Sequence, residues 1–356
     1  MSSKIAIAMS GGVDSLVSAH LLLGKTHDLV GVHFLTGYEA PEQAGDDQGA
    51  PESLFQAARA LGISIHVVRL QAEFQSMVVQ PFVETYLKGQ TPNPCMVCNQ
   101  TIKFGALLDT VRRDLGVQRI ATGHYARVSE DSRGRFRLFK GADPLKDQSY
   151  FLSFLNQGQL GSAIFPLGEL TKDQVWEKAR QLGLDIHTKP ESQETCFIAD
   201  DRYRNFLQSQ PGFRSRPGDI VDIHGKPIGR HEGVFAFTIG QRRGINIPAS
   251  QAYYVKDIDP ASNSIMIGIK TDLLSGGAFV EGINWIVPPG EDRFRARTRI
   301  RYRHKEADST ITVTGENTAV AIFDEPQSAV TPGQGAVFYQ GDEVLGAGWI
   351  SSASTA

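Results

Sequence analysis

The hexapeptide at positions 10–15, Ser-Gly-Gly-Val-Asp-Ser, constrains the fold of this chain more than any other segment. It follows a short apolar run at 5–9 and precedes a helix-like stretch at 16–23. Where a strand passes through a glycine turn into a helix, backbone N–H groups converge on a phosphate, and adjacent glycines let the anion approach closely. The loop contains no lysine, so it is not a Walker A motif. It predicts a phosphate site opening an α/β domain; a tight turn without a ligand is the alternative.

Composition sets the broad class. A chain of 356 residues with 41% hydrophobic and 21% charged residues is typical of two or three globular domains. No apolar run approaches the ~20 residues that span a membrane, and the N-terminus lacks a signal-peptide pattern. Three cysteines, an odd and small number, favour a reducing cytoplasm, and we expect a cytoplasmic protein. The net charge of −3 gives no global sign of a nucleic-acid partner.

Up to about residue 205 the pattern alternates between strands and helices. Strands are expected at 30–34, 63–70 and 119–122, with a helix at 53–61. Thr171 and Gln174 form a capping box that begins a further helix, which Gly183 ends. This alternation predicts a doubly wound, parallel, Rossmann-like sheet.

After about residue 205 short β-branched runs recur between Gly/Pro turns. The expected strands are at 219–223, 233–238, 253–258, 264–269, 311–313, 318–323 and 335–339. We therefore predict three domains: a catalytic domain at 1–205, a small β-rich domain at 206–275 and a C-terminal β-barrel at 276–356.

The cysteines form two motifs. Cys95 and Cys98 lie in Thr-Pro-Asn-Pro-Cys-Met-Val-Cys-Asn at 91–99, and Cys196 lies in Thr-Cys-Phe-Ile at 195–198. The two prolines predict an ordered loop before Cys95 and place Cys98 near the start of a helix at 101–111, where the helix dipole lowers a thiol pKa. Buried apolar thiols, a zinc site completed by His124 or His187, and a redox pair remain open alternatives.

Basic residues occupy every odd position from Arg293 to Lys305. Period two places them on one face of a strand, with successive charges ~6.6 Å apart, near the spacing of backbone phosphates. An edge strand protected by charge is the alternative. Two further segments, Gly-His-Tyr at 123–125 and Lys-Asp-Gln-Ser-Tyr-Phe at 146–151, indicate little by themselves, although the first ends a strand where ligands of open sheets gather.

Together these segments resemble the tRNA-specific 2-thiouridylases, and the resemblance covers nearly the whole chain. Eight motifs fall in family order: SGGVDS at 10–15, TPNPCxxCN at 91–99, IKFG at 102–105, ATGHY at 121–125, KDQSYFL at 146–152, TCFI at 195–198, GQRRG at 240–244 and TPGQ at 331–334. The resemblance implies a nucleotide-binding domain of the adenine nucleotide alpha hydrolase type.

The family chemistry is ATP-dependent 2-thiolation of the wobble uridine, with adenylation of O2 followed by sulfur transfer to C2. The resemblance implies that Cys196 carries a persulfide and that Cys98 is the nucleophile that attacks it, leaving a disulfide. Asp14 would hold Mg²⁺. The implied ATP-binding residues are Ala8, Met9, Ser10, Gly11, Gly12, Val13, Asp14, Ser15, Phe34 and Gly123.

The same resemblance implies the RNA contacts and the partners. The target base would face Asn93, Pro94 and Cys95. Other tRNA contacts would be His124, Lys146, Asp147, Gln148, Arg301, Tyr302 and Gln334. The implied tRNAs are those for lysine, glutamate and glutamine, and the sulfur donor is a cysteine desulfurase or a relay protein. No membrane partner is expected.

Cys95 departs from the family pattern, in which many members carry aspartate in TPNPD. Cys95, Cys98 and Cys196 together could instead ligate a [4Fe–4S] cluster with one open iron for sulfide, which gives a second hypothesis for the sulfur carrier. Two more distant readings are an adenylating ligase or amidotransferase with the same loop, and a non-enzymatic RNA-binding protein. The first leaves the cysteines and arginines unexplained, and the second leaves SGGVDS unexplained.

Overall fold

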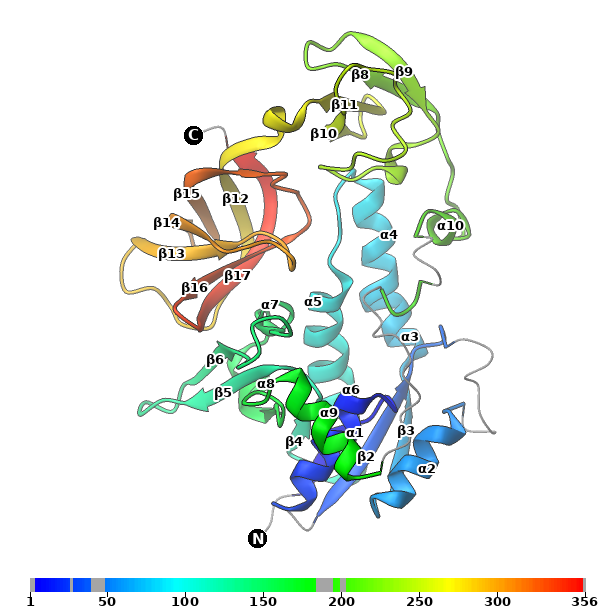
Figure 1. Cartoon of the computed structure of the whole chain (residues 1–356), viewed down its shortest axis with the longest axis vertical. Helices are drawn as coiled ribbons and strands as arrows, with labels where there is room; N and C mark the ends of the chain where they lie inside the picture. The colour runs from blue at the N-terminus through cyan, green and yellow to red at the C-terminus, as the bar shows by residue number, and fades with distance from the viewer. Residues whose placement is uncertain (1–3, 26–27, 40–48, 184–194, 199–202, 355–356) are drawn as a thin grey trace. The chain divides into compact units, whose positions relative to one another are not determined.

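The computed structural model describes residues 4–25, 28–39, 49–183, 195–198 and 203–354. The chain divides into two compact units (Figure 1). Unit 1 comprises residues 1–78, 95–193 and 342–344, and unit 2 comprises residues 79–94, 194–341 and 345–356.

Unit 1 is built on a parallel sheet with strand order β3-β2-β1-β4-β7. The strands are β1 (Ile5–Ala8), β2 (Leu29–Leu35), β3 (Ile65–Arg69), β4 (Arg119–Ala121) and β7 (Ala163–Ile164). The helices are α1 (Val13–Leu23), α2 (Glu52–Ala60), α3 (Gln71–Phe74), α6 (Leu107–Leu115), α7 (Ser149–Leu152), α8 (Gln157–Ser162) and α9 (Lys172–Gln181). A π-helix, η2 (Gln75–Val79), follows α3, and a hairpin of β5 (Ala126–Glu130) and β6 (Phe136–Lys140) follows β4.

Apolar side chains of the central strand and two helices form the core of this unit. Ile7 of β1, Leu16 of α1 and Leu54 of α2 are at most 3% exposed and belong to one cluster. A second cluster joins Val17 of α1 to Val175 of α9. β1 lies between β2 and β4, so the sheet reverses its winding direction there, and the loop after β1 lies where such folds bind ligands.

Unit 2 contains α4 (Gln80–Leu87), α10 (Tyr203–Gln208) and two β-structures. The first is a four-stranded sheet, β10-β11-β8-β9, formed by β8 (Gly218–Val221), β9 (Pro227–His231), β10 (Tyr254–Asp259) and β11 (Ser264–Gly268). The second belongs to an eight-stranded sheet: its strands, in the order β12-β15-β14-β13-β16-β17, close into a barrel through β12–β17 pairing, and β6 pairs with the first residues of β17. Its strands are β12 (Leu274–Trp285), β13 (Arg293–Arg299), β14 (Ala307–Gly315), β15 (Thr318–Ser328), β16 (Gly335–Gln340) and β17 (Glu343–Ser354).

The expected fold class is confirmed: a doubly wound parallel sheet, a β-rich segment and a β-barrel. The expected helix at 171–183 is also confirmed, because both halves of the Thr171–Gln174 capping box form.

Three local expectations are wrong. The run 233–238 is not a strand but contains a 3₁₀ turn, η5 (Val234–Ala236), since an unbroken apolar run does not distinguish a strand from a buried turn. Pro94 begins helix α5 (Pro94–Cys98) rather than extending a loop, because proline fits the first helical turn. The arginine strand ends at Arg299, so Arg301, Arg303 and Lys305 do not share its face.

Candidate active site: the nucleotide loop, two cysteine motifs and an arginine turn

The loop between β1 and α1 forms an open anion cradle. Gly11 has φ +80°, which favours glycine, and Gly12 is the N-cap of α1 without a side-chain cap. Ser15 closes the turn, since its Oγ donates to the Gly12 carbonyl at 2.8 Å and accepts from Ser10 N–H at 3.3 Å. The first N–H groups of an eleven-residue helix are therefore presented to a ligand without a competing side-chain cap.

Other expected nucleotide residues lie around this loop. A Cβ on Gly123 would stand 3.0–3.1 Å from Asp14 and Ser15 atoms, so glycine allows the end of β4 to approach the first turn of α1. Ala8 ends β1, and Met9 N–H donates to the Val32 carbonyl of β2 at 2.8 Å. Phe34 lies two residues further along β2 and is half-buried. Val13, the first residue of α1, is buried in the core.

Asp14 is already engaged by two residues that the sequence did not mark. Lys172 Nζ donates to both carboxylate oxygens, at 2.8 and 2.9 Å, and the Tyr125 hydroxyl donates to Oδ1 at 2.8 Å. Lys172 is 7% exposed although it carries a charge. Oδ2 accepts one of these three hydrogen bonds, so it has a further lone pair for Mg²⁺ while the contact with Lys172 stands. Lys172 follows the Thr171 cap and Tyr125 ends ATGHY, but neither position indicated a partner.

His124 is buried and neutral. Burial, reinforced by the nearby Lys103 ammonium, holds the pKa of His124 well below its usual value. Lys103 Nζ lies 3.5 Å from Nε2, and Thr122 Oγ1 lies 2.7 Å from Nδ1. Because the ammonium can only donate, Nε2 is the accepting nitrogen and Nδ1 carries the proton that it donates to Thr122. With 8% exposure, His124 offers little surface to an RNA.

Two carboxylates of the loop at 143–148 accept hydrogen bonds from the backbone around it. Asp147, 4% exposed, accepts from the N–H of Gly141 and from the N–H and hydroxyl of Ser149, at 3.0–3.2 Å. Lys146 and Gln148 flank it and are half-buried. Asp147 thus shapes the loop, whereas Lys146 and Gln148 keep surface for a ligand.

The first cysteine motif lies on a helical run that begins at α5 and continues through the π-helix η3 (Asn99–Ala106) into α6. Cys95 is exposed, while Cys98 is 8% exposed. Asn99 Nδ2 donates to the Phe151 carbonyl at 3.1 Å and fixes this run against the segment after the 143–148 loop.

Two motifs that lie far apart in the sequence, at 91–99 and at 331–334, are joined by hydrogen bonds before Asn93. Gln334 Nε2 donates to the carbonyls of Thr91 and Pro92, both at 3.0 Å, and Thr91 N–H donates to the Pro332 carbonyl at 2.9 Å. Gln334, expected as a tRNA contact, therefore also fixes the Thr-Pro-Asn-Pro segment. Asn93 itself is 8% exposed.

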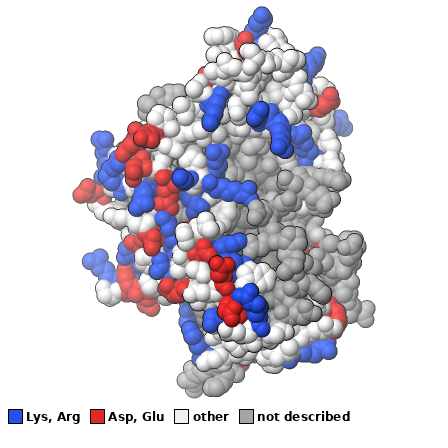
Figure 2. Space-filling model, viewed as in Figure 1, with Lys and Arg blue, Asp and Glu red and all other residues white. Residues whose placement is uncertain are grey.

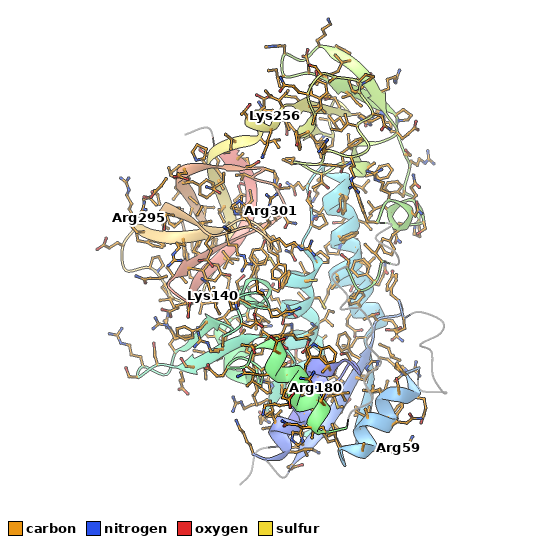
Figure 3. The ribbon with its side chains drawn as sticks, in the orientation of Figure 1. Arg59, Lys140, Arg180, Lys256, Arg295 and Arg301 are labelled. Carbon is orange, nitrogen blue, oxygen red and sulfur yellow. The ribbon has the colours of Figure 1, made fainter. Side chains whose placement is uncertain are left out.

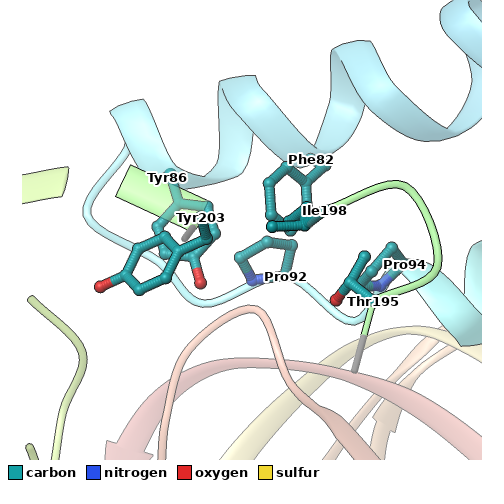
Figure 4. Close-up of a pocket in the computed structure, with 7 residues that line it drawn as sticks. All are labelled: Phe82, Tyr86, Pro92, Pro94, Thr195, Ile198 and Tyr203. Atoms are coloured by element: carbon teal, nitrogen blue, oxygen red, sulfur yellow. The ribbon is translucent and has the colours of Figure 1, made fainter. Parts of the chain in front are cut away.

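The segments beside the two cysteine motifs line one pocket of about 110 Å³ within unit 2 (Figure 4). Phe197 anchors the second motif with an edge-on ring contact to Phe82 and a tilted one to Phe206, whose centroids lie 5.2 and 5.3 Å away. Cys196 next to it is exposed. The lining residues are Phe82, Tyr86, Pro92, Pro94, Thr195, Ile198 and Tyr203. The neighbours of Cys95 and Cys196 in sequence, Pro94 and Thr195, thus share a pocket that has the size of a small planar ring.

Two of the four arginines in the strand lie beside acidic side chains, and further basic residues follow in the turn after it. Arg295 pairs with Asp324 at 2.7 Å, and Arg297 lies 3.7 Å from Glu306. Figure 2 likewise shows Asp and Glu side chains among the Lys and Arg side chains of the face it draws. Arg299 donates to the Tyr302 carbonyl, and its guanidinium lies 5.3 Å from the Tyr302 ring centroid. Arg301, labelled with Arg295 in Figure 3, is half-buried in this turn.

The described residues contain no group of three or more His, Cys, Asp or Glu side chains that could hold a metal ion. All three cysteines and His124 are among them, whereas His187, named as a zinc ligand, lies outside the described residues. Within the same described ranges, no helix has the length and hydropathy to cross a bilayer.

The fold and the loop define a nucleotide-binding α/β protein with two appended β-structures, and comparisons with known proteins agree. Residues 3–200 match the family model described as tRNA methyl transferase HUP domain. Residues 204–269 match a tRNA methyl transferase PRC-barrel domain, and residues 275–350 match an aminomethyltransferase beta-barrel domain.

Curated relatives match over nearly the whole chain. The tRNA-specific 2-thiouridylase MnmA of Desulfosudis oleivorans is 47% identical over 97% of this chain and 94% of its own length. That of Syntrophotalea carbinolica is 46% identical, with 98% of each chain covered. The chain belongs to the tRNA-specific 2-thiouridylase family. A solved U34-tRNA thiolase, NcsA from Methanococcus maripaludis with its [4Fe-4S] cluster, overlaps 59% of this chain and 68% of its own at 21% identity, with a TM-score of 0.35, too low to compare sites.

Proposed function

We propose that this protein is a tRNA-uridine 2-sulfurtransferase that thiolates C2 of the wobble uridine and converts ATP to AMP and pyrophosphate. The observation that carries the proposal is that an open phosphate cradle in unit 1 accompanies a ring-sized pocket in unit 2 that both cysteine motifs flank. The family-model descriptions name a methyl transferase and the relatives a 2-thiouridylase. Methyl transfer requires neither a pyrophosphate loop nor paired cysteine motifs, so these residues favour sulfur.

The first step uses the cradle. The uridine O2 attacks the α-phosphorus of ATP, the bond to the β-phosphate oxygen breaks, and pyrophosphate leaves. The N–H groups at the start of α1 and the Ser10 hydroxyl bind the departing phosphates, Ser15 keeps the turn closed, and Gly123 lets the end of β4 approach the first turn of α1. Asp14 would hold Mg²⁺, which would offset the negative charge of the phosphates.

The second step uses the thiols. The outer sulfur of a Cys196 persulfide bonds to C2, and AMP leaves with the former O2. The Cys98 thiolate attacks the Cys196 sulfur, the persulfide S–S bond breaks, and its electron pair stays with the sulfur on C2. A Cys98–Cys196 disulfide remains, and a cellular thiol must reduce it before the next turnover.

Cys95 stands where many relatives carry aspartate, and we propose that it faces the target base together with Asn93 and Pro94. A [4Fe–4S] cluster on Cys95, Cys98 and Cys196 is the alternative carrier. The three thiolates would be its ligands and would leave one iron open for sulfide.

For the substrate we propose the tRNAs for lysine, glutamate and glutamine, contacted by Lys146, Gln148, Arg301 and Tyr302. A cysteine desulfurase or relay protein supplies the sulfur, in the cytoplasm. The three-domain division at about 205 and 275 is part of the same proposal.

The test is mass spectrometry of nucleosides from an unmodified lysine tRNA transcript after incubation with the protein, Mg-ATP and a persulfide donor, alongside pyrophosphate release. We expect 2-thiouridine to appear and pyrophosphate release to require the tRNA. Release without tRNA would identify a ligase, no release at all would identify a binding protein, and a methylated base would identify a methyltransferase. Iron and acid-labile sulfide are measured on the same anaerobic sample; activity that tracks about four irons per chain would replace the persulfide by the cluster.

A further inference from the structure

One hydrogen-bond network within unit 1 joins the nucleotide loop to the 143–148 loop. At its centre, the Asp14 carboxylate accepts three hydrogen bonds, two from Lys172 Nζ and one from the Tyr125 hydroxyl. The Lys172 ammonium also lies 5.9 Å from the Tyr125 ring centroid and 5.4 Å from that of Trp176. The ammonium therefore contacts the Asp14 carboxylate and two aromatic rings at once.

The backbones of the same two residues hold the other loop. Tyr125 N–H donates to Gln148 Oε1 at 3.0 Å, and Gln148 N–H donates to the Tyr125 carbonyl at 2.9 Å. Lys172 N–H donates to Asp143 Oδ2 at 2.9 Å, and the other oxygen of that carboxylate accepts from Leu145 N–H at 2.9 Å. Tyr125 and Lys172 thus each contact Asp14 through the side chain and residues 143–148 through the backbone.

The stability of the fold does not by itself explain the Lys172–Asp14 pair. A buried ion pair seldom stabilises a fold more than well-packed apolar side chains do, because desolvation offsets the attraction. The Lys172 side chain is 9% exposed and that of Asp14 is 33% exposed, so the pair opens to solvent only on the carboxylate side, where the nucleotide loop lies. The charged pair therefore faces the proposed nucleotide site.

We infer that Lys172 and Tyr125 are positioning residues that couple the two loops, so that a bound nucleotide orders the 143–148 loop for RNA and bound RNA orders the cradle for ATP. The inference rests on the proposed function, which makes residues 143–148 an RNA-contact segment. The nucleotide loop and the 143–148 loop share one set of hydrogen bonds. The first ligand therefore orders the loop that the second ligand contacts, and the second ligand binds more tightly. This coupling makes ATP consumption depend on a seated tRNA.

The experiment measures binding, not activity. The probes are α,β-methylene-ATP with Mg²⁺, which cannot release pyrophosphate, and an unmodified lysine tRNA transcript. The dissociation constant of each is measured with and without saturating amounts of the other, and hydrogen exchange of residues 143–148 is followed with and without the nucleotide. The variants are Tyr125→Phe, which keeps both backbone contacts with Gln148, and Lys172→Met. The controls are Lys172→Arg, which keeps the charge, and Lys178→Met, which removes a half-buried lysine from the same helix.

For the wild type we expect each ligand to tighten the other by the same factor, within about 5–150-fold, and the nucleotide to slow exchange at 143–148. Tyr125→Phe and Lys172→Met should bring that factor below about 2 and abolish the slowing. Lys178→Met should match the wild type, and Lys172→Arg should restore at least half of the coupling free energy. A merely structural role would weaken both ligands without changing the factor between them.

Three outcomes overturn the inference. One is a wild-type factor near 1, and another is a variant that keeps the full factor and the slowed exchange. The third is a wild-type protein that binds neither probe, which refutes the proposed function itself and is recognised before any variant is made.

Discussion

Gly123→Ala tests the geometry of the nucleotide cradle most directly. The new Cβ would lie 3.0 Å from the Asp14 carbonyl carbon, 3.1 Å from Asp14 Cβ and 3.1 Å from Ser15 N. These distances are shorter than ordinary van der Waals contact, and two of the three atoms belong to the backbone of the first turn of α1. A flexible side-chain end cannot move aside here, so the helix N-terminus itself must shift by a few tenths of an ångström.

Inserting a methyl group into well-packed surroundings costs about 1–3 kcal/mol. If the strain is relieved by moving the cradle, nucleotide binding weakens by about 5- to 150-fold, since about 1.4 kcal/mol corresponds to a factor of ten. The assay is calorimetric titration with α,β-methylene-ATP and Mg²⁺, with thermal unfolding of the same samples to confirm that the variant is folded.

Gly24→Ala is the matched control. Gly24 ends α1 with φ −71°, and a Cβ there meets nothing within 4 Å, so the same chemical change should leave affinity within twofold of the wild type. A folded Gly123→Ala protein that binds as tightly as the wild type would refute the close-approach argument. Equal losses in both variants would show that the effect is not local to the cradle.

Three further outcomes are expected. Cys98→Ser and Cys196→Ser should each abolish 2-thiouridine formation by mass spectrometry while α,β-methylene-ATP binds within threefold of the wild type; loss of nucleotide binding would count against their assigned roles. Arg301→Ala should weaken tRNA binding and reduce the slope of log K against log salt by about 1, whereas Arg295→Ala, already paired with Asp324, should leave the slope unchanged. The folded pKa of His124 lies well below its usual value near 6.5, so the unfolded chain binds the extra proton first and stability falls as pH drops below about 6.5. Chemical denaturation of His124→Gln should show a shallower fall over that pH range, and an identical pH profile would contradict the burial argument.

Local patterns in the sequence were sufficient to predict the α/β class, the loop at 10–15 and the helix capped by Thr171. They depend on interactions within a few residues, such as glycine φ angles, capping hydrogen bonds and apolar periodicity. The same local rules were wrong where tertiary packing decides between conformations. The run at 233–238 turns because Phe235 packs edge-on against Phe213, with centroids 4.7 Å apart. The arginine strand ends at Arg299 because the chain turns there. The alternation of basic residues continues to Lys305 and does not predict this turn.

The sequence by itself identified the residues that we propose carry the chemistry: a glycine loop that can cradle a phosphate, and thiols in two separate motifs. Only the tertiary structure decided their partners. Lys172 contacts Asp14 from 158 positions away, and Gln334 fixes Thr91 from 243 positions away. The pocket beside the cysteine motifs is lined by residues of two separate segments, 82–94 and 195–203. Such contacts between distant residues arise when sheets and barrels close to bury apolar surface. The sequence pattern does not predict which polar side chains that closure brings together.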